Sequence, residues 1–98
     1  MTDVETSHNL EKRRYEAHID GELAGFVDYR PSVGLVTFFH TEVDDRFEGQ
    51  GVGSALVRFA LDDARDGSDR VLVTCPFITT WIGKHPEYAD VLETPSAD

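Results

Sequence analysis

The sequence predicts an α/β domain of the mixed α+β kind: an antiparallel three-stranded meander, a crossover helix, a parallel fourth strand and a short C-terminal helix. Three observations predict it: alternating apolar residues on either side of Asp20-Gly21, a glycine-rich loop that opens a helical apolar stripe, and a short apolar run near residue 72. The chain has 98 residues, which fits one domain. We expect residues 1–12 to be a flexible leader, 13–93 the folded domain and 94–98 a flexible tail.

The first half of the chain has the two-residue period of a β-sheet. Apolar residues alternate over 15–19, and the hairpin signal Asp20-Gly21 precedes a return strand over 22–29. A turn is expected at Arg30-Pro31-Ser32, because proline cannot donate to a strand ladder. The third strand, residues 34–43, is apolar on both faces, which predicts a central position in the sheet.

The second half has a helical period followed by one more strand. From Val52 to Ala64 apolar residues recur at spacings of three and four, and Gly67 ends the helix. The apolar run Val71–Cys75 then returns as a strand, and the order strand, helix, strand predicts that it pairs in parallel with the third strand. A second helix is expected over 77–85, with a last short element at 86–92.

Composition excludes several classes of function. The chain carries 9 Lys+Arg against 19 Asp+Glu, a net charge of -10, whereas a nucleic-acid-binding protein needs a basic face. No apolar run reaches the ~20 residues of a membrane span. A single cysteine allows no internal disulfide and favours a cytoplasmic location. The histidines lack metal-ligand spacing, so no metal site is expected. The acidity suits a cationic acceptor, although a solvated acidic surface is the simpler explanation.

The loop Gly49-Gln50-Gly51-Val52-Gly53-Ser54 lies between the third strand and the helix. Glycine lets a backbone approach a ligand closely, and the first N–H groups of a helix have no intrahelical partner. Together with the helix dipole they form an anion site suited to a pyrophosphate. The alternative is a glycine turn with no ligand. The spacing matches neither the dinucleotide-binding fingerprint nor the P-loop.

Residues 46–57 read Arg-Phe-Glu-Gly-Gln-Gly-Val-Gly-Ser-Ala-Leu-Val. They resemble the acyl-CoA-binding motif of the GNAT superfamily of N-acetyltransferases, Q/R-x-x-G-x-G/A, with Glu48 in place of the usual Gln or Arg. Cys75-Pro-Phe77 and His85-Pro-Glu-Tyr88 are similar to motifs of a compact GNAT-like family of about this length. The resemblance covers residues 14–92. It implies a minimal GNAT-like core that binds acetyl-CoA or CoA, with the pantetheine arm between the two parallel strands, and transfers an acetyl group to an amine.

The candidate catalytic residues are Cys75, His40 and Glu42. As a thiolate, Cys75 can take the acyl group and pass it on; a small buried apolar residue is the equal alternative. His40 can act as a base or lower the pKa of the thiol, with a core histidine as the alternative. Glu42 shares a face with His40 by the period of two, and a plain solvated carboxylate is its alternative.

Lys84 and His85 are candidates for the nucleotide end of CoA, and helix-end cations are the alternative. Phe77, Trp81 and Tyr88 can line a pantetheine groove, with core packing as the alternative for Phe77.

Two other functions stay open. The first is a non-catalytic acyl-CoA sensor, which Glu48 and the lack of a tyrosine within 77–85 favour. The second is an interaction domain that has lost its ligand. We expect a monomer or weak homodimer with an acceptor site that is open or completed by a partner chain.

Overall fold

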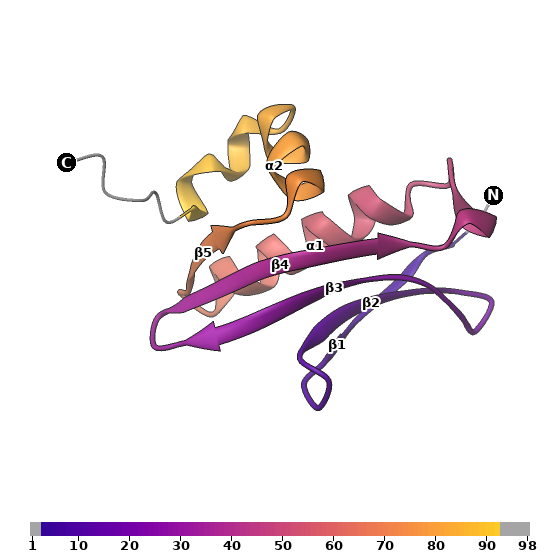
Figure 1. Cartoon of the computed structure of the whole chain (residues 1–98), viewed down its shortest axis with the longest axis horizontal. Coiled ribbons are helices and arrows are strands. Elements are labelled where there is room, and N and C mark those ends of the chain that lie inside the picture. The colour runs from indigo at the N-terminus through magenta and orange to yellow at the C-terminus, as the bar shows by residue number, and fades with distance from the viewer. Residues whose placement is uncertain (1–2, 93–98) are drawn as a thin grey trace.

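The computed structural model describes residues 3–92, which form a five-stranded sheet with helices on it (Figure 1). The elements in chain order are β1 (Glu5–Asn9), β2 (Arg14–Ile19), β3 (Glu22–Ser32), β4 (Leu35–Val43), the 3-10 helix η1 (Asp45–Phe47), α1 (Val52–Asp66), β5 (Arg70–Val73), α2 (Pro76–Gly83) and the 3-10 helix η2 (Pro86–Val91). The mixed α/β architecture predicted from the sequence is confirmed. No helix in the described part of the chain is long and apolar enough to cross a bilayer.

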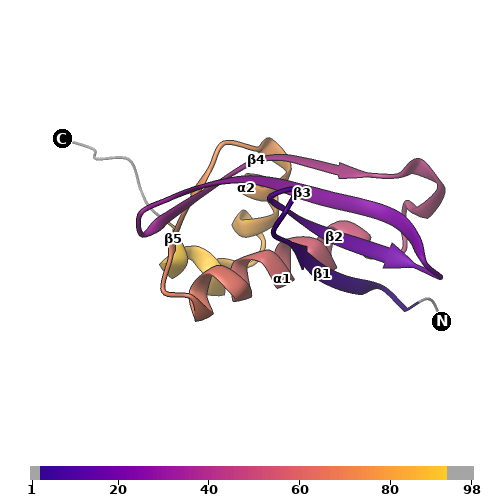
Figure 2. The same cartoon turned by 90° about the horizontal axis from the view of Figure 1, so that it is seen from below.

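The strands lie in sequence order across the sheet, and only the last pair is parallel. The antiparallel meander, the crossover helix and the parallel strand therefore match the prediction. Figure 2 shows α1 along one face of the sheet, where it contacts β2, β3, β4 and β5. The short helix α2 packs beside α1 and β5 at one end of the molecule.

The core lies between the sheet and the apolar stripe of α1. The stripe repeats with the helical period, so one face of α1 is buried while charged residues cover the other. Phe38 of β4 and Leu56 and Leu61 of α1 are fully buried. Burying a side chain of this size stabilises the fold by roughly 1.5–3 kcal/mol. This core holds α1 against β4, and the site lies at the end of β4 beside the start of α1.

The N-terminal segment differs from the prediction of a flexible leader over residues 1–12. Residues 5–9 form β1 and pair with β2 in continuous antiparallel register. The strand is polar, so its sequence lacks the apolar alternation by which strands are recognised. Side chains hold it instead: the ring of His8 stacks on Tyr15 at a centroid distance of 4.3 Å, and its Nε2 hydrogen-bonds the hydroxyl of Tyr29. The predicted C-terminal tail lies outside the described residues.

The turn predicted at Arg30-Pro31-Ser32 is also wrong. β3 continues to Ser32, with Pro31 opposite Val36, and the chain turns at residues 33–34. Pairing between β2 and β3 ends at Asp28, so this end of β3 has a free edge. A strand tolerates proline at such an edge, because the missing N–H has no neighbouring strand to reach.

A β-bulge interrupts the pairing of β3 with β4. Asp28 lies opposite His40 and Tyr29 lies opposite Phe38, so Phe39 has no partner residue on β3. Side chains along a strand alternate between its two faces, and one extra residue reverses that alternation for everything that follows. The two halves of β4 therefore present their even-numbered residues to opposite faces of the sheet.

Candidate functional site

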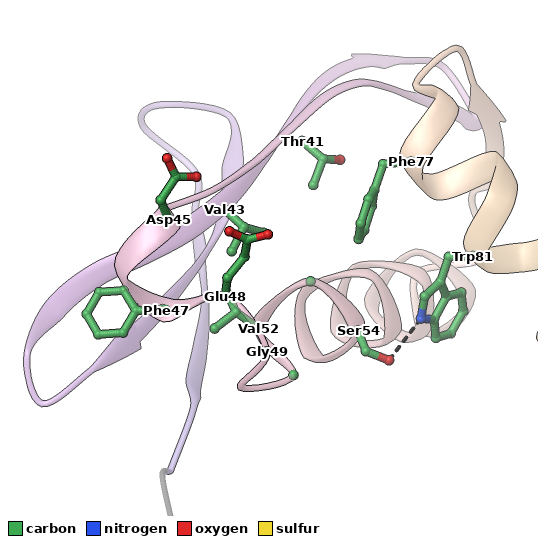
Figure 3. Close-up of a pocket in the computed structure, with 12 residues that line it drawn as sticks. Thr41, Val43, Asp45, Phe47, Glu48, Gly49, Val52, Ser54, Phe77 and Trp81 are labelled. Atoms are coloured by element: carbon green, nitrogen blue, oxygen red, sulfur yellow. Dashed lines mark hydrogen bonds between the residues drawn. The ribbon is translucent and has the colours of Figure 1, made fainter.

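A pocket of about 400 Å³ opens where the two parallel strands part (Figure 3). The paired stretch of β4 and β5 ends at Phe38 and Val73, and the N–H of Thr74 still donates to the carbonyl of Phe38 at 3.1 Å. Beyond this point the chain after β5 turns into α2, while β4 continues to Val43. The wedge between them is walled by the end of β4, the loop before α1, the first turn of α1 and α2.

The N-terminus of α1 opens into this pocket. Gly51, its N-cap residue, has a φ of 81° in the left-handed region, which favours glycine, and no side chain caps the helix. The first intrahelical bond runs from the N–H of Ala55 to the carbonyl of Gly51, so the N–H groups of Val52, Gly53 and Ser54 have no intrahelical acceptor. Free donors at the positive end of a 15-residue helix form an anion site. The predicted loop therefore has the geometry that a diphosphate needs.

Carboxylates border the same pocket. Asp45 and Glu48 contribute to its wall, and no Lys or Arg among residues 3–92 does so (Figure 3). Arg46 turns away, with its Nε 3.1 Å from Asp44 Oδ1 and its Nη1 3.4 Å from Glu22 Oε1. A bound anion would therefore rely on neutral donors, the backbone N–H groups and the Ser54 hydroxyl.

Phe77 stands over the first turn of α1. A Cβ added at Gly53 would come within 2.5 Å of Phe77 Cζ, so the ring can lie there only because residue 53 has no side chain. Its ring is 44% exposed and also borders a second pocket of about 390 Å³ that extends along α2 to Lys84. The core position considered for Phe77 is therefore wrong: the ring is a wall between two pockets.

Cys75 lies just behind the pocket wall. It is the N-cap residue of α2 rather than the end of the strand, it is 5% exposed, and its Sγ lies 3.4 Å from Thr41 Oγ1. Burial alone would raise the pKa of the thiol, but its hydrogen bond with the Thr41 hydroxyl and those from the N–H groups of Ile78 and Phe77 bring that pKa below its ordinary value. Thr41, not Cys75, contributes to the pocket surface.

His40 and Glu42 lie together on the opposite face of β4. His40 Nε2 is 3.4 Å from Glu42 Oε1, both side chains are exposed, and the His40 ring packs on Phe26 at a centroid distance of 5.9 Å. The bulge is the reason: it turns Thr41 toward the pocket and its two neighbours away from it. His40 is thus not a core histidine, and it does not share a face with the residue that contacts the thiol.

Lys84 and His85, which were considered for the nucleotide end of CoA, have different surroundings. His85 stacks on Trp81 at 3.8 Å with an interplanar angle of 11°, and its Nδ1 lies 2.9 Å from the Trp81 carbonyl oxygen. That is a packing role at the end of α2. Lys84 borders the second pocket and is free to meet an anion there.

Of the aromatic candidates, Trp81 lines the main pocket, whereas Tyr88 does not. The Tyr88 ring is 5% exposed, and its hydroxyl donates to Asp62 Oδ1 at 2.9 Å, away from the wedge. Thr41 was not identified from the sequence. The only signal for it is the alternation along β4, and that alternation gives the wrong face unless the bulge is known.

A family model described as GCN5-related N-acetyl-transferase matches residues 14–91. Protein NATD1 of Bos taurus is 28% identical over 85 residues, which covers 85% of this chain and 75% of that protein. The solution structure of a GCN5-like protein of Staphylococcus aureus superimposes with a TM-score of 0.73 at 22% identity, covering 99% of this chain and 95% of the other. The ribosomal-protein-S18-alanine N-acetyltransferase of Escherichia coli gives a TM-score of 0.65 at 14% identity, covering 88% and 76%. At these identities the solved structures show a common fold.

Proposed function

The chain belongs to the GCN5-related N-acetyltransferase family, and we propose that it binds acetyl-CoA and transfers the acetyl group to an amine acceptor. One observation carries the proposal: the uncapped N-terminus of α1 opens into the wedge between β4 and the start of α2. We assign the diphosphate of CoA to the N–H groups of Val52, Gly53 and Ser54. We assign the pantetheine arm to the apolar wall that Val43 and Phe77 provide. When bound, the thioester supplies the activated acyl carbon.

Direct transfer to the amine is one route. His40 lies just beyond the last paired residues of the parallel strands and faces solvent on the side of the sheet opposite the pocket. An amine that reaches the thioester through the gap between the strands would pass His40 on that side. Its imidazole would accept the proton that the amine nitrogen loses as the C–N bond forms and the C–S bond breaks. Glu42, 3.4 Å away, would orient the ring and stabilise the imidazolium. The CoA thiolate leaves and takes up a proton from solvent.

Transfer through Cys75 is the second route. The lowered pKa of the thiol and its position at the N-cap of α2 support a thiolate, which is the nucleophilic form. Its sulfur would form a new thioester as CoA leaves, and the amine would then displace the sulfur. Thr41 stands between Sγ and the pocket, so this route requires the Thr41 side chain to rotate.

A non-catalytic acyl-CoA sensor is the second candidate function. The carboxylates of Asp45 and Glu48 in the pocket wall, and the absence of a tyrosine hydroxyl among its described lining residues, favour this candidate. Turnover with any member of a panel of amines would exclude it.

Intact-protein mass spectrometry after incubation with acetyl-CoA separates these functions. A gain of one acetyl group that disappears in Cys75→Ala supports the relay, whereas a CoA complex without an adduct leaves direct transfer or sensing. An adduct that survives the substitution would refute the role of Cys75.

The binding claim itself is tested at Gly53. Gly53→Glu should abolish CoA binding, because it adds a carboxylate at the N-terminus of α1. Gly53→Ala displaces the Phe77 ring without adding charge, so the difference in CoA affinity between the two variants measures the effect of the carboxylate. Gly83→Glu is the matched control, since a Cβ there meets nothing within 4 Å and Gly83 does not line the pocket. Unchanged affinity in Gly53→Glu would remove the central claim.

A further inference from the structure

Trp81 and Ser54 join the two helices that wall the pocket. The indole Nε1 of Trp81 donates to Ser54 Oγ at 2.9 Å, and both residues line the pocket (Figure 3). An indole N–H can only donate, so Trp81 is the donor of this hydrogen bond. The hydroxyl of Ser54 must be the acceptor.

That direction decides what the hydroxyl proton can do. A serine hydroxyl has one proton to donate, and the bond from Trp81 uses one of its oxygen lone pairs. Serine hydroxyls often give this proton to a backbone carbonyl nearby in the chain. Within residues 3–92 the Ser54 hydroxyl donates to no protein group. The proton is therefore available to a molecule in the pocket.

Trp81 is itself held in place from several sides. Its ring stacks on His85 at 3.8 Å, the guanidinium carbon of Arg58 lies 5.4 Å above it, and the side chain is only 7% exposed. A donor fixed in this way orients the hydroxyl before any ligand arrives. Preorganised donors bind an anion better than mobile ones, because less conformational entropy is lost on binding.

We propose that Trp81 is a positioning residue for the anionic part of CoA: it holds Ser54 Oγ as an acceptor, so that the Ser54 hydroxyl donates to the diphosphate beside the N–H groups of α1. This inference rests on the proposed function. It also accounts for an anion site whose described wall contains no cation, since every donor in it is neutral.

The chain contains one tryptophan, so its indole N–H resonance belongs to Trp81. Calorimetric titration with CoA is compared for the original chain, Ser54→Ala, Trp81→Phe and the double variant. Each single variant should bind about tenfold more weakly, as expected for loss of one hydrogen bond to a charged group. The double variant should be no weaker than either single one, because the two residues act through the same hydroxyl.

Two further variants separate positioning from packing. Ser54→Thr keeps the hydroxyl and should retain CoA affinity within about threefold. Ser7→Ala, at an exposed position of β1 that lines neither pocket, should leave the affinity unchanged. Without CoA, the indole N–H resonance of Ser54→Ala should differ from that of the original chain, because the hydrogen bond from Trp81 is lost. The Ser54 variants give an answer even if Trp81→Phe does not fold.

Single variants that bind CoA as tightly as the original chain, or a double variant whose loss is the sum of the two, would overturn this inference and leave CoA binding intact. An original chain that does not bind CoA would overturn the proposed function and the inference together.

Discussion

Gly25 is a position on β3 where β4 and the start of α1 both approach closely. A Cβ built there would lie 2.7 Å from the carbonyl oxygen of Glu42, 3.1 Å from Leu56 Cδ1 and 3.2 Å from Val52 Cγ1. The two side chains can shift by a few tenths of an ångström. The carbonyl belongs to the backbone of β4 and moves only if the strand moves. Gly25→Ala should therefore force β3 away from β4, or α1 away from both.

The expected cost follows from two opposing effects. Overpacking costs about 1–3 kcal/mol, and replacing glycine by alanine returns roughly 0.4–1 kcal/mol by restricting the unfolded chain. A net loss of about 1–2 kcal/mol would lower Tm by about 5–15 °C in a domain of this size. Thermal and urea unfolding followed by circular dichroism measure it, with Gly83→Ala as the control because no atom lies within 4 Å of a Cβ there. A Gly25→Ala chain as stable as the control would refute the close approach.

Three further predictions concern charge. Glu16→Gln should destabilise the fold by about 1–3 kcal/mol at neutral pH by weakening the bond from Arg14. Burial would raise the Glu16 pKa, but that bond lowers it, so the variant should lose less stability as pH falls below about 4.3. Burial and Asp63 raise the Tyr15 pKa, so the original chain should lose stability above about pH 10, where tyrosine ionises in the unfolded state. Tyr15→Phe should lose less stability over that range; an unfolding free energy with the same pH dependence as the original chain would contradict this. Added salt should tighten CoA binding, and Glu48→Gln should tighten it by about two- to fivefold at low salt; weaker binding in salt would contradict a cation-free pocket.

The parts of the fold that follow from periodicity could be predicted from the sequence. The apolar stripe after Val52 gives α1, the hairpin signal at Asp20-Gly21 gives the turn between β2 and β3, and the order strand, helix, strand gives the parallel pair. Each of these depends on neighbouring residues alone. The polar strand β1 does not, because only its partners on β2 and the ring of Tyr15 reveal that it pairs.

The candidate site divides in the same way. The glycine loop is a local feature, and its open helix N-terminus could be anticipated residue by residue. The faces to which the β4 side chains point could not be predicted, because no glycine or proline marks the bulge at Phe39. A one-residue change in phase moved His40 to solvent and Thr41 to the pocket, and no composition argument detects such a change. Contacts between helices, such as the hydrogen bond from Trp81 to Ser54, depend on three-dimensional packing and could not be predicted from the sequence either.

The bulge also divides β4 into two parts that have different roles. Before Phe39, β4 contributes to the core, where residue volume is constrained; after it, the strand contributes to the pocket, where chemistry is constrained. Phe38 and Thr41 both lie on the side of the sheet that α1 covers, although they are three residues apart in the chain, because the bulge takes up Phe39. Loss of Phe39 would restore regular alternation along β4 and would leave both residues on that side. The extra residue therefore changes the length of chain between the core and the pocket without changing the face of the sheet that each of them uses.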